Sequence, residues 1–377
     1  MVNMMDQPPR GQVRCKICGG TATQILDHIC GNCLKKEPER IVQDLTKKAH
    51  SESRMIPPVL PPQDPGGVTC YECGNLCRIK EEEYGFCRLR QVKNGRIHTR
   101  INTSREAVGI FYFDPLPTNC VADWVCPGGT GAGYPQYAYS PGPEYGYKNL
   151  AIFFGSCSFD CLYCQNSSYR EMALKGKPLF TVQEIIRSLD DKSACICFFG
   201  GDPSPQMSFA LSVAREALKE KKGEILRICW ETNGNIHPKY LDDMARTSLS
   251  SGGIIKFDLK AWDEKLHRIL TGASNRQTFK NFKYIYQGYF DKRSNPPLLV
   301  ASTLLIPGYI EEEEVRNIAN FLVKLNPRIP YTLLAFSPQH MMTDLPLLTW
   351  EEANECLEAA QGVGLERVRL GNTHLLR

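Results

Sequence analysis

From residue 149 onward, short apolar runs alternate with segments in which apolar residues recur at helical spacing. The apolar runs have the length of β-strands and cover residues 150–154, 194–199, 226–230, 254–259, 298–305 and 331–336. The helix-like segments cover residues 182–189, 207–221, 238–246, 276–289, 311–325 and 350–362. Regular alternation of strands and helices predicts a parallel sheet covered by helices. Because six units are too few for an eight-stranded barrel, we expect an α/β fold with a partial, open (β/α)6 barrel over residues 149–377.

Two of the expected helices carry a recognisable start signal. Thr181 is followed three residues later by Glu184, and Thr349 is followed in the same way by Glu352. In such a capping box the threonine hydroxyl accepts a hydrogen bond from the backbone N–H three residues on, and the carboxylate accepts one from the threonine N–H. We therefore expect helices to begin directly after Thr181 and Thr349.

The first 148 residues lack this alternation and are rich in cysteine. Two Cys-x2-Cys pairs come first, formed by Cys15, Cys18, Cys30 and Cys33. Four thiolates at this spacing are typical of a zinc-ribbon or rubredoxin-like site for one zinc or iron ion, the alternative being free thiols in a flexible tail. We assign residues 1–54 to this module, residues 55–68 to a stiff proline-rich linker, and residues 69–148 to a cysteine-containing extension.

Further cysteines lie outside these two pairs. A second group in the extension consists of Cys70, Cys73, Cys77 and Cys87. This group could bind one zinc ion or an auxiliary cluster. Cys120 and Cys126 belong to no motif, so ordinary thiols are favoured there, although a role as ligands of an auxiliary cluster stays open. Cys195 and Cys197 share one face of an expected strand and are interpreted as buried thiols of the core.

Composition narrows the class of protein. The chain has 377 residues, of which 42% are hydrophobic, and can bury a large core. Its net charge of +4 is too small to favour a nucleic-acid partner. No run approaches the roughly twenty apolar residues that span a bilayer, and no secretion signal is recognisable. Seventeen cysteines are then better explained as metal ligands and buried thiols than as disulfides, so we expect a cytoplasmic protein, without a membrane partner, in an anaerobic or strongly reducing setting.

The strongest signal for chemistry is a third cysteine group, directly after the first strand of the expected barrel. Cys157, Cys161 and Cys164 have the spacing Cys-x3-Cys-x2-Cys. Three thiolates can hold a [4Fe–4S] cluster and leave one iron without a protein ligand, so that this iron can bind a substrate. A zinc knuckle or chance clustering is the alternative, but no further His or Cys follows at close spacing. The group lies on the loop that leaves the carboxyl end of a strand, where β/α folds build their active sites.

This spacing, with the aromatic Tyr163 before the last cysteine, resembles the radical S-adenosylmethionine (SAM) superfamily. The second cysteine group and the residues that follow it, up to position 90, resemble the segment that precedes the core of relatives of pyruvate formate-lyase activating enzyme. The resemblance covers about residues 68–377. It implies the same partial barrel, together with a [4Fe–4S] cluster and SAM as cofactors.

The resemblance also implies SAM-contacting residues at the ends of successive strands. Gly200, Gly201 and Asp202 are similar to the Gly-Gly-Glu-Pro motif that holds the methionine amino group, with Asp in place of Glu. In the activating-enzyme branch, the next two strands end in residues that contact SAM or a monovalent cation, which implies Asn233 for SAM and Glu231, Thr232 and Asp258 for the cation. The superfamily pattern places Ile306 and Gly308 of the fifth strand against the adenine. The full set of implied cofactor-binding residues is Tyr163, Gly200, Gly201, Asp202, Glu231, Asn233, Asp258, Ile306 and Gly308.

The function implied by the resemblance is reductive cleavage of SAM to a 5′-deoxyadenosyl radical, which abstracts hydrogen from a protein or small-molecule substrate. A glycine in a partner protein would give a glycyl radical, and a flavodoxin or ferredoxin would be the one-electron donor. Two alternatives remain open. One is a radical SAM methyltransferase or another protein-modifying enzyme, and the other is a zinc-ribbon protein that binds nucleic acid or protein.

Overall fold

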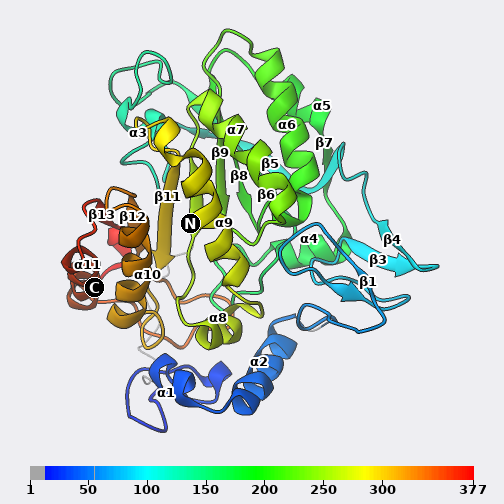
Figure 1. Cartoon of the computed structure of the whole chain (residues 1–377), viewed down its shortest axis with the longest axis vertical. Coiled ribbons are helices and arrows are strands. Elements are labelled where there is room, and N and C mark those ends of the chain that lie inside the picture. The colour runs from blue at the N-terminus through cyan, green and yellow to red at the C-terminus, as the bar shows by residue number, and fades with distance from the viewer. Residues whose placement is uncertain (1–12, 55) are drawn as a thin grey trace, which may run out of the picture.

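The computed structural model describes residues 13–54 and 56–377, and its centre is a nine-stranded sheet (Figure 1). Six neighbouring strands run parallel to one another, which confirms the predicted α/β fold. They are β6 (Lys148–Phe154), β8 (Ser193–Gly200), β9 (Arg227–Thr232), β10 (Ile255–Asp258), β11 (Leu299–Leu304) and β12 (Tyr331–Leu334). A seventh parallel strand, β13 (Val368–Gly371), extends the β12 edge. Its four residues are too few to produce a recognisable pattern in the sequence.

The opposite edge of the sheet is antiparallel, which corrects the expectation of a purely parallel sheet. Strand β5 (Glu106–Pro115) pairs antiparallel with β6, and β7 (Leu179–Thr181) pairs antiparallel with the start of β5. An antiparallel strand at the edge of a parallel sheet is common. The sequence hides β5 because Gly109 interrupts its apolar run. Gly109 has a φ of +150°, and a Cβ there would collide with the carbonyl oxygen of Phe153.

Helices cover the outer face of the parallel strands (Figure 1). They are α5 (Val182–Ser188), α6 (Met207–Glu220), α7 (Leu241–Ser251), α8 (Glu264–Thr271), α9 (Arg276–Tyr289), α10 (Glu312–Leu325) and α11 (Trp350–Gly362). Both predicted capping boxes are present, so α5 begins after Thr181 and α11 begins after Thr349. Two short helices, α3 (Pro127–Thr130) and α4 (Tyr169–Lys175), lie in the loops before β6 and after the cysteines of the third group.

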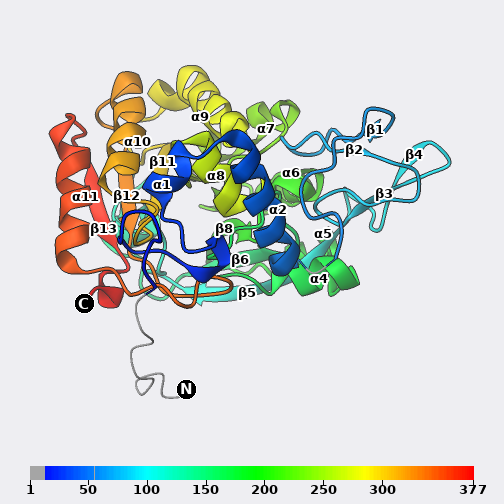
Figure 2. The ribbon, with the colours of Figure 1, turned by 90° about the horizontal axis from the view of Figure 1, so that it is seen from below.

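The N-terminal segment folds across the end of the barrel where the cysteine loop lies (Figure 2). It contains a short 3-10 helix (Gln24–Leu26), α1 (Gly31–Lys36) and α2 (Glu39–Arg54). The N–H of Gly31 donates to the carbonyl of Gly308 (2.8 Å), and the N–H of Thr23 donates to the hydroxyl of Tyr309 (3.0 Å). Both contacts join this segment to the loop after β11.

The cysteine-containing extension forms two small sheets beside the barrel (Figure 1). Strands β1 (Val68–Thr69) and β2 (Arg78–Ile79) make one antiparallel pair. Strands β3 (Arg90–Lys93) and β4 (Arg96–Thr99) make the other, as a hairpin that turns at Asn94 and Gly95. An Asn-Gly turn is favoured in two-residue hairpins because both residues tolerate positive φ.

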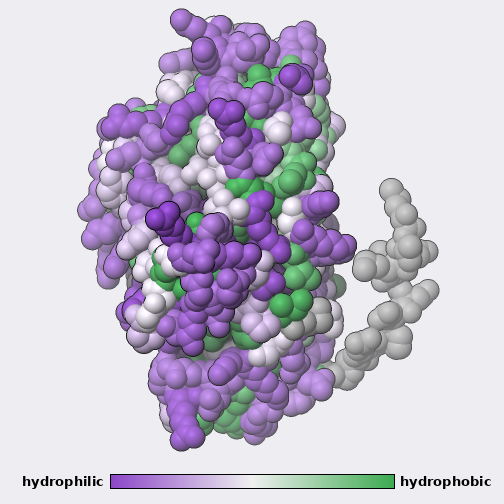
Figure 3. Space-filling model, turned by 90° about the vertical axis from the view of Figure 1, so that its right-hand side faces the viewer, coloured by the Kyte–Doolittle hydropathy of each residue, from purple (hydrophilic) through white to green (hydrophobic). Residues whose placement is uncertain are grey.

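Two large groups of buried apolar side chains hold these parts together. One lies between the sheet and the outer helices, and the other surrounds the cysteine loop and includes Leu26, Ile29 and Leu34 of the N-terminal segment. On the side shown in Figure 3, apolar side chains form several separate groups among polar ones. Among the described residues, no helix has the length and apolar character needed to span a membrane.

The interior of the barrel contains a buried ion pair at the end opposite the cysteine loop. Arg227 on β9 and Glu144, in the loop before β6, are almost completely inaccessible to solvent. Nη1 of Arg227 donates to Glu144 (2.9 Å) and to the carbonyl of Tyr137 (3.0 Å). This pair anchors the long loop of residues 116–147 inside the barrel.

Replacing Glu144 tests the contribution of this ion pair to stability. We expect Glu144→Ala to lower the free energy of unfolding by about 3–5 kcal/mol, because it leaves a buried guanidinium without its carboxylate. Chemical denaturation followed by circular dichroism measures the effect. The exposed Glu216 on α6 provides the matched control, and Glu216→Ala should change the free energy of unfolding by less than about 0.5 kcal/mol. Equal effects of the two substitutions would contradict the assignment.

Candidate active site

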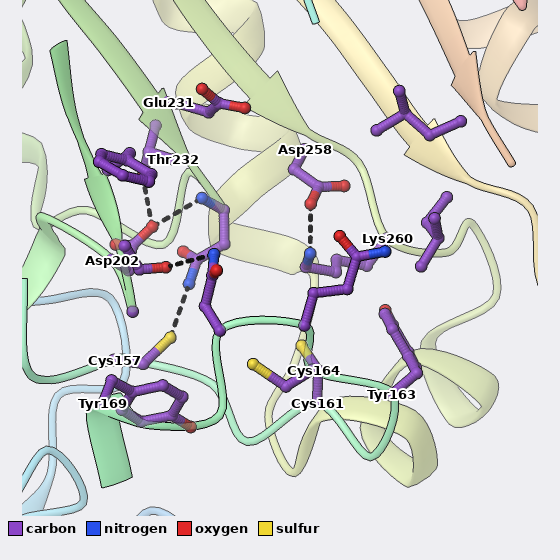
Figure 4. Close-up of a pocket in the computed structure, with 18 residues that line it drawn as sticks. Cys157, Cys161, Tyr163, Cys164, Tyr169, Asp202, Glu231, Thr232, Asp258 and Lys260 are labelled. Carbon is purple, nitrogen blue, oxygen red and sulfur yellow. Dashed lines mark hydrogen bonds and ion pairs between the residues drawn. The ribbon is translucent and has the colours of Figure 1, made fainter. Parts of the chain in front are cut away.

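A cavity opens at the carboxyl ends of the parallel strands, and polar side chains from successive strands converge on it (Figure 4). Three cysteines of the loop after β6 form one wall. The ends of β8, β9, β10, β11 and β12 supply the rest of the lining. The lining residues predicted from the sequence are Cys157, Cys161, Tyr163, Cys164, Gly200, Gly201, Asp202, Glu231, Thr232, Asn233 and Asp258.

The cysteine loop owes its shape to the buried Asp160. The carboxylate of Asp160 is fully inaccessible, lies 2.8 Å from Nδ1 of His50 on α2, and accepts a hydrogen bond from Nε of Arg170 on α4 (2.7 Å). The N–H of Asp160 donates to the carbonyl of Thr271 at the end of α8 (2.8 Å). Burial alone would raise the pKa of Asp160, but His50 and Arg170 lower it well below its usual range. Three helices therefore hold the loop at a single residue, two of them through its charged side chain.

The thiols of the loop have the properties expected of metal ligands. Burial raises the pKa of Cys157 well above its usual value and that of Cys161 to about 12, so without a metal both stay protonated at neutral pH. The N–H of Phe159 (3.4 Å) and the side-chain amide of Asn233 (3.6 Å) donate to the sulfur of Cys157. The three sulfurs do not all lie within 4.8 Å of one another, as ligands of one ion would. Thiolates of a four-iron cluster bind separate iron atoms and stand farther apart, so the loop fits a cluster.

The Gly200-Gly201-Asp202 turn is packed tightly against the neighbouring strand. Gly200 has a φ of +107°, and a Cβ on Gly201 would collide with the carbonyl oxygen of Ser156. The buried carboxylate of Asp202 accepts hydrogen bonds from the N–H of Asn233 (2.7 Å), the hydroxyl of Thr232 (2.9 Å) and Ser204. Burial raises the pKa of Asp202, and these donors oppose the shift. Protein donors thus surround this side chain, and its contact with the SAM ammonium group stays a prediction.

The two carboxylates implied as cation ligands both lie beside lysines. Asp258 contacts the ammonium group of Lys260, and Glu231 lies 3.5 Å from that of Lys256. Burial alone would lower the pKa of Lys260, but Asp258 and the sulfur of Cys161 raise it well above its usual range. Both lysines are therefore charged and supply the positive charge next to the carboxylates. The monovalent cation stays a prediction.

Three other implied residues occupy different surroundings. Tyr163 lines the cavity, and its buried hydroxyl has no hydrogen-bond partner among the described residues. Ile306 is fully buried, and Gly308 turns with a φ of +79° beneath the N-terminal segment, where a Cβ would collide with the carbonyl of Thr21. Neither residue belongs to the cavity lining, to which β11 contributes Leu304.

Sequence reasoning missed several cavity residues. Lys260 lies two residues after Asp258, just beyond the end of β10, and contacts that carboxylate. Tyr169 and Phe199 also line the cavity. No motif distinguishes either of them from a core aromatic residue.

Comparison with known proteins agrees with this geometry. Residues 151–322 match the family model of the radical SAM superfamily. This part of the chain is a radical SAM domain. It contains the cysteine loop and four of the five strands whose ends line the cavity, β8 to β11.

The chain is similar to several activating enzymes. It is 28% identical over 194 residues to a Methanocaldococcus jannaschii protein provisionally named a glycyl-radical enzyme activating enzyme, covering 50% of this chain and 67% of that protein. It is 29% identical to the isethionate sulfite-lyase activating enzyme of Oleidesulfovibrio alaskensis (50% and 58% covered). It is 25% identical to the pyruvate formate-lyase 1-activating enzyme of Escherichia coli (35% and 54% covered). The chain thus spans about half to two thirds of the length of these relatives.

Among solved structures, a domain of a pyruvate-formate lyase-activating enzyme from Bacteroides vulgatus aligns with 47% of this chain and 98% of its own length. The identity is 20% and the TM-score is 0.36. A SuiB structure from Streptococcus suis bound to S-adenosylmethionine aligns with 58% of this chain at 15% identity and a TM-score of 0.42.

The first cysteine group next to the radical SAM domain is arranged for a single ion. The ligand atoms of Cys15, Cys18, Cys30 and Cys33 all lie within 4.8 Å of one another. Cys18 is exposed and the other three are buried. Four thiolates at this separation can form the tetrahedral shell of zinc or iron, and they fit either metal.

The sulfur atoms of the second cysteine group lie farther apart than those of the first group. All four of its thiols are buried, and burial together with the nearby sulfurs of Cys77, Cys87 and Cys70 raises the pKa of Cys73 well above its usual value. Nη1 of Arg90 donates to the sulfur of Cys87 (3.7 Å). Among the residues that the structure describes, no three ligand atoms of this group lie within 4.8 Å of one another. Metal binding by this group stays a prediction.

Metal content tests the first cysteine group. We expect the double variant Cys15→Ser/Cys33→Ser to lose about one zinc or iron ion per chain, because two remaining thiolates cannot close a tetrahedral shell. Metal analysis by mass spectrometry measures the loss. The matched control is Cys356→Ser, which removes a buried thiol of α11 and should leave the metal content unchanged. An unchanged content in the double variant would contradict the assignment.

Proposed function

We propose that this chain is a radical SAM enzyme that reductively cleaves SAM at a [4Fe–4S] cluster held by Cys157, Cys161 and Cys164. The observation that carries the proposal is a three-thiol loop that opens directly onto a cavity lined by polar groups. When bound, the cluster and SAM supply a 5′-deoxyadenosyl radical for hydrogen abstraction. A cluster with only three thiolates keeps one iron available for a substrate, which an electron-carrying cluster with four thiolates does not.

The surrounding residues position the ligand and exclude water. Asn233 donates to the sulfur of Cys157, and the carboxylate of Asp202 accepts a hydrogen bond from the backbone N–H of Asn233. These contacts fix the end of β9 relative to the end of β8 and to the cysteine loop. Lys260 and Asp258 place one charge of each sign at the cavity wall. The unpartnered hydroxyl of Tyr163 and Oδ1 of Asp258 are the atoms best placed to bind a polar ligand. The aminocarboxylate and ribose groups of SAM carry complementary donors and acceptors.

The proposal includes the substrate, which we take to be a partner protein. One of the similar proteins is named for activating a glycyl-radical enzyme and two are named as activating enzymes of lyases, which favours a glycine in a partner protein as the hydrogen donor. A flavodoxin or ferredoxin would supply the single electron. The four-thiolate site of the N-terminal segment would be structural, or would carry electrons if it holds iron.

Detection of 5′-deoxyadenosine tests SAM cleavage. We expect the anaerobically reconstituted and reduced protein to form it, and the variant Cys157→Ala/Cys161→Ala/Cys164→Ala to form none above background, because the variant lacks the cluster. Liquid chromatography with mass spectrometry measures the product.

The control variant, Cys356→Ala, removes a buried thiol of α11 outside the cavity and should retain the rate of the unmodified protein within about twofold. Product formation by the triple variant, or none by a wild-type protein that carries a reducible cluster, would refute the proposed activity.

A further inference from the structure

A second cavity lies deeper in the barrel, and five cysteines line it. Two of them, Cys120 and Cys126, come from the long loop between β5 and β6. Cys195 and Cys197 come from β8, and Cys229 comes from β9. Residues far apart in the sequence thus bring their thiols to one place. The two cavities meet at Phe199 and Glu231, which line both.

The surroundings of Cys120, Cys126, Cys197 and Cys229 differ from those of the fifth thiol, Cys195. Cys197 and Cys229 are direct neighbours in the parallel register of β8 and β9. Cys120 and Cys126 come from one loop and line the cavity together with this pair. The fifth thiol, that of Cys195, donates its S–H to the side-chain oxygen of Asn149 (3.2 Å), and Cys126 directs its S–H at the carbonyl oxygen of Asp123 (3.7 Å).

N–H groups are directed at the sulfurs of this cavity. The ammonium group of Lys256 donates to Cys120 (3.2 Å) and to Cys197 (3.3 Å). The backbone N–H of Gly129 donates to Cys126 (3.3 Å), and that of Ala122 donates to Cys120 (3.5 Å). Cys157 in the active site receives donors of the same kind. Hydrogen bonds to sulfur stabilise thiolates and tune the potentials of iron–sulfur clusters.

The positive charge that Lys256 brings to these sulfurs also favours thiolates. Its side chain is 3% exposed, and the carboxylate within reach, that of Glu231, lies 3.5 Å away and is one third exposed. A buried ammonium group facing neutral thiols would be poorly compensated. Metal-bound thiolates would supply the missing negative charge.

The spacing of the sulfurs decides what kind of metal group fits. In the described part of the chain, no three ligand atoms here lie within 4.8 Å of one another, so the cavity does not form a single-ion site. The cavity volume is about 180 Å³ at the active site and about 150 Å³ here. The second volume is far above the roughly 10–15 Å³ that one water molecule needs. Separated thiolates around an open volume match a polynuclear cluster.

We propose that Cys120, Cys126, Cys197 and Cys229 hold a second iron–sulfur cluster inside the barrel, with Lys256 as a hydrogen-bond donor to its thiolates. Four thiolates leave no iron free for a substrate, so this cluster transfers electrons. Its position beside Phe199 and Glu231 allows one-electron exchange with the contents of the active-site cavity. Only this last role rests on the proposed SAM cleavage.

Acid-labile sulfide separates this site from the other cysteine groups. The starting protein is the variant Cys157→Ala/Cys161→Ala/Cys164→Ala, reconstituted anaerobically with iron and sulfide. The first cysteine group binds a single ion and contributes no labile sulfide. We expect this protein to retain labile sulfide together with iron, and to lose the labile sulfide to background when Cys197→Ala and Cys229→Ala are added.

The matched control adds Cys195→Ala instead, which removes a thiol from the same face of the same strand and should leave the labile sulfide unchanged. Absence of labile sulfide in the starting protein would overturn the proposal, as would zinc alone. Its retention after the Cys197→Ala and Cys229→Ala changes would also overturn it, and would assign the sulfide to Cys70, Cys73, Cys77 and Cys87. SAM cleavage is measured separately in the protein with all cysteines present, so either proposal can fail without the other.

A charge variant keeps the proposal testable if the double cysteine change prevents folding. In the starting protein, Lys256→Gln removes a positive charge next to the thiolates and should shift the midpoint potential of the remaining cluster to a more negative value. Redox titration followed by electron paramagnetic resonance measures the shift. Lys280→Gln, at an exposed position of α9, should leave the potential unchanged. An unchanged potential in Lys256→Gln would overturn the proposal.

Discussion

The buried carboxylate of Asp160 is the contact on which the rest of the site depends. It lies between the first two cysteines of the active-site loop and binds His50 of α2 and Arg170 of α4, while the backbone N–H of Asp160 donates to the end of α8. A charge this deeply buried persists only when donors surround it. The position of the three thiols is thus tied to the docking of the N-terminal segment. The same docking covers the loop after β11 at Gly308, so the N-terminal segment is tied to both the cysteine loop and this loop.

A second buried carboxylate, that of Asp202, fixes the wall of the cavity formed by the ends of β8 and β9. Its acceptor sites are filled by Ser204, Thr232 and Asn233, which link the ends of β8 and β9. The preceding glycines are needed because the backbone presses against β6. The shorter side chain of Asp, compared with the Glu of the superfamily motif, keeps the carboxylate among these protein donors. The polar groups left for a ligand then include Asp258, Lys260 and Tyr163.

The sequence predicted those features that depend on local pattern. Six parallel strands were recognisable because each is an apolar run between polar segments, whereas Gly109 hid β5 and the shortness of β13 hid that strand. The spacing of Cys157, Cys161 and Cys164 is local, so their convergence on one loop could be predicted. Two partners of Asp202, Thr232 and Asn233, lie 30 and 31 residues away, and no spacing rule predicts that they fill its acceptor sites. The gathering of Cys120 with Cys197 depends on how the loop after β5 enters the barrel, which is a long-range property of the fold.

Charge inside the barrel follows a layered order that connects these sites. The deepest layer is the ion pair of Arg227 and Glu144, and the layer nearest the cysteine loop is that of Lys260 and Asp258. In each of these two layers, one positively charged side chain pairs with one carboxylate. In the middle layer, Lys256 faces the half-open Glu231 on one side and two sulfur atoms on the other. Since burial penalises uncompensated charge, this is the layer in which thiolate formation most improves the electrostatic balance. Alternate residues of a strand share one face, so β9 directs Arg227, Cys229 and Glu231 to the same side. This alternation sets the order of the charged layers in the barrel.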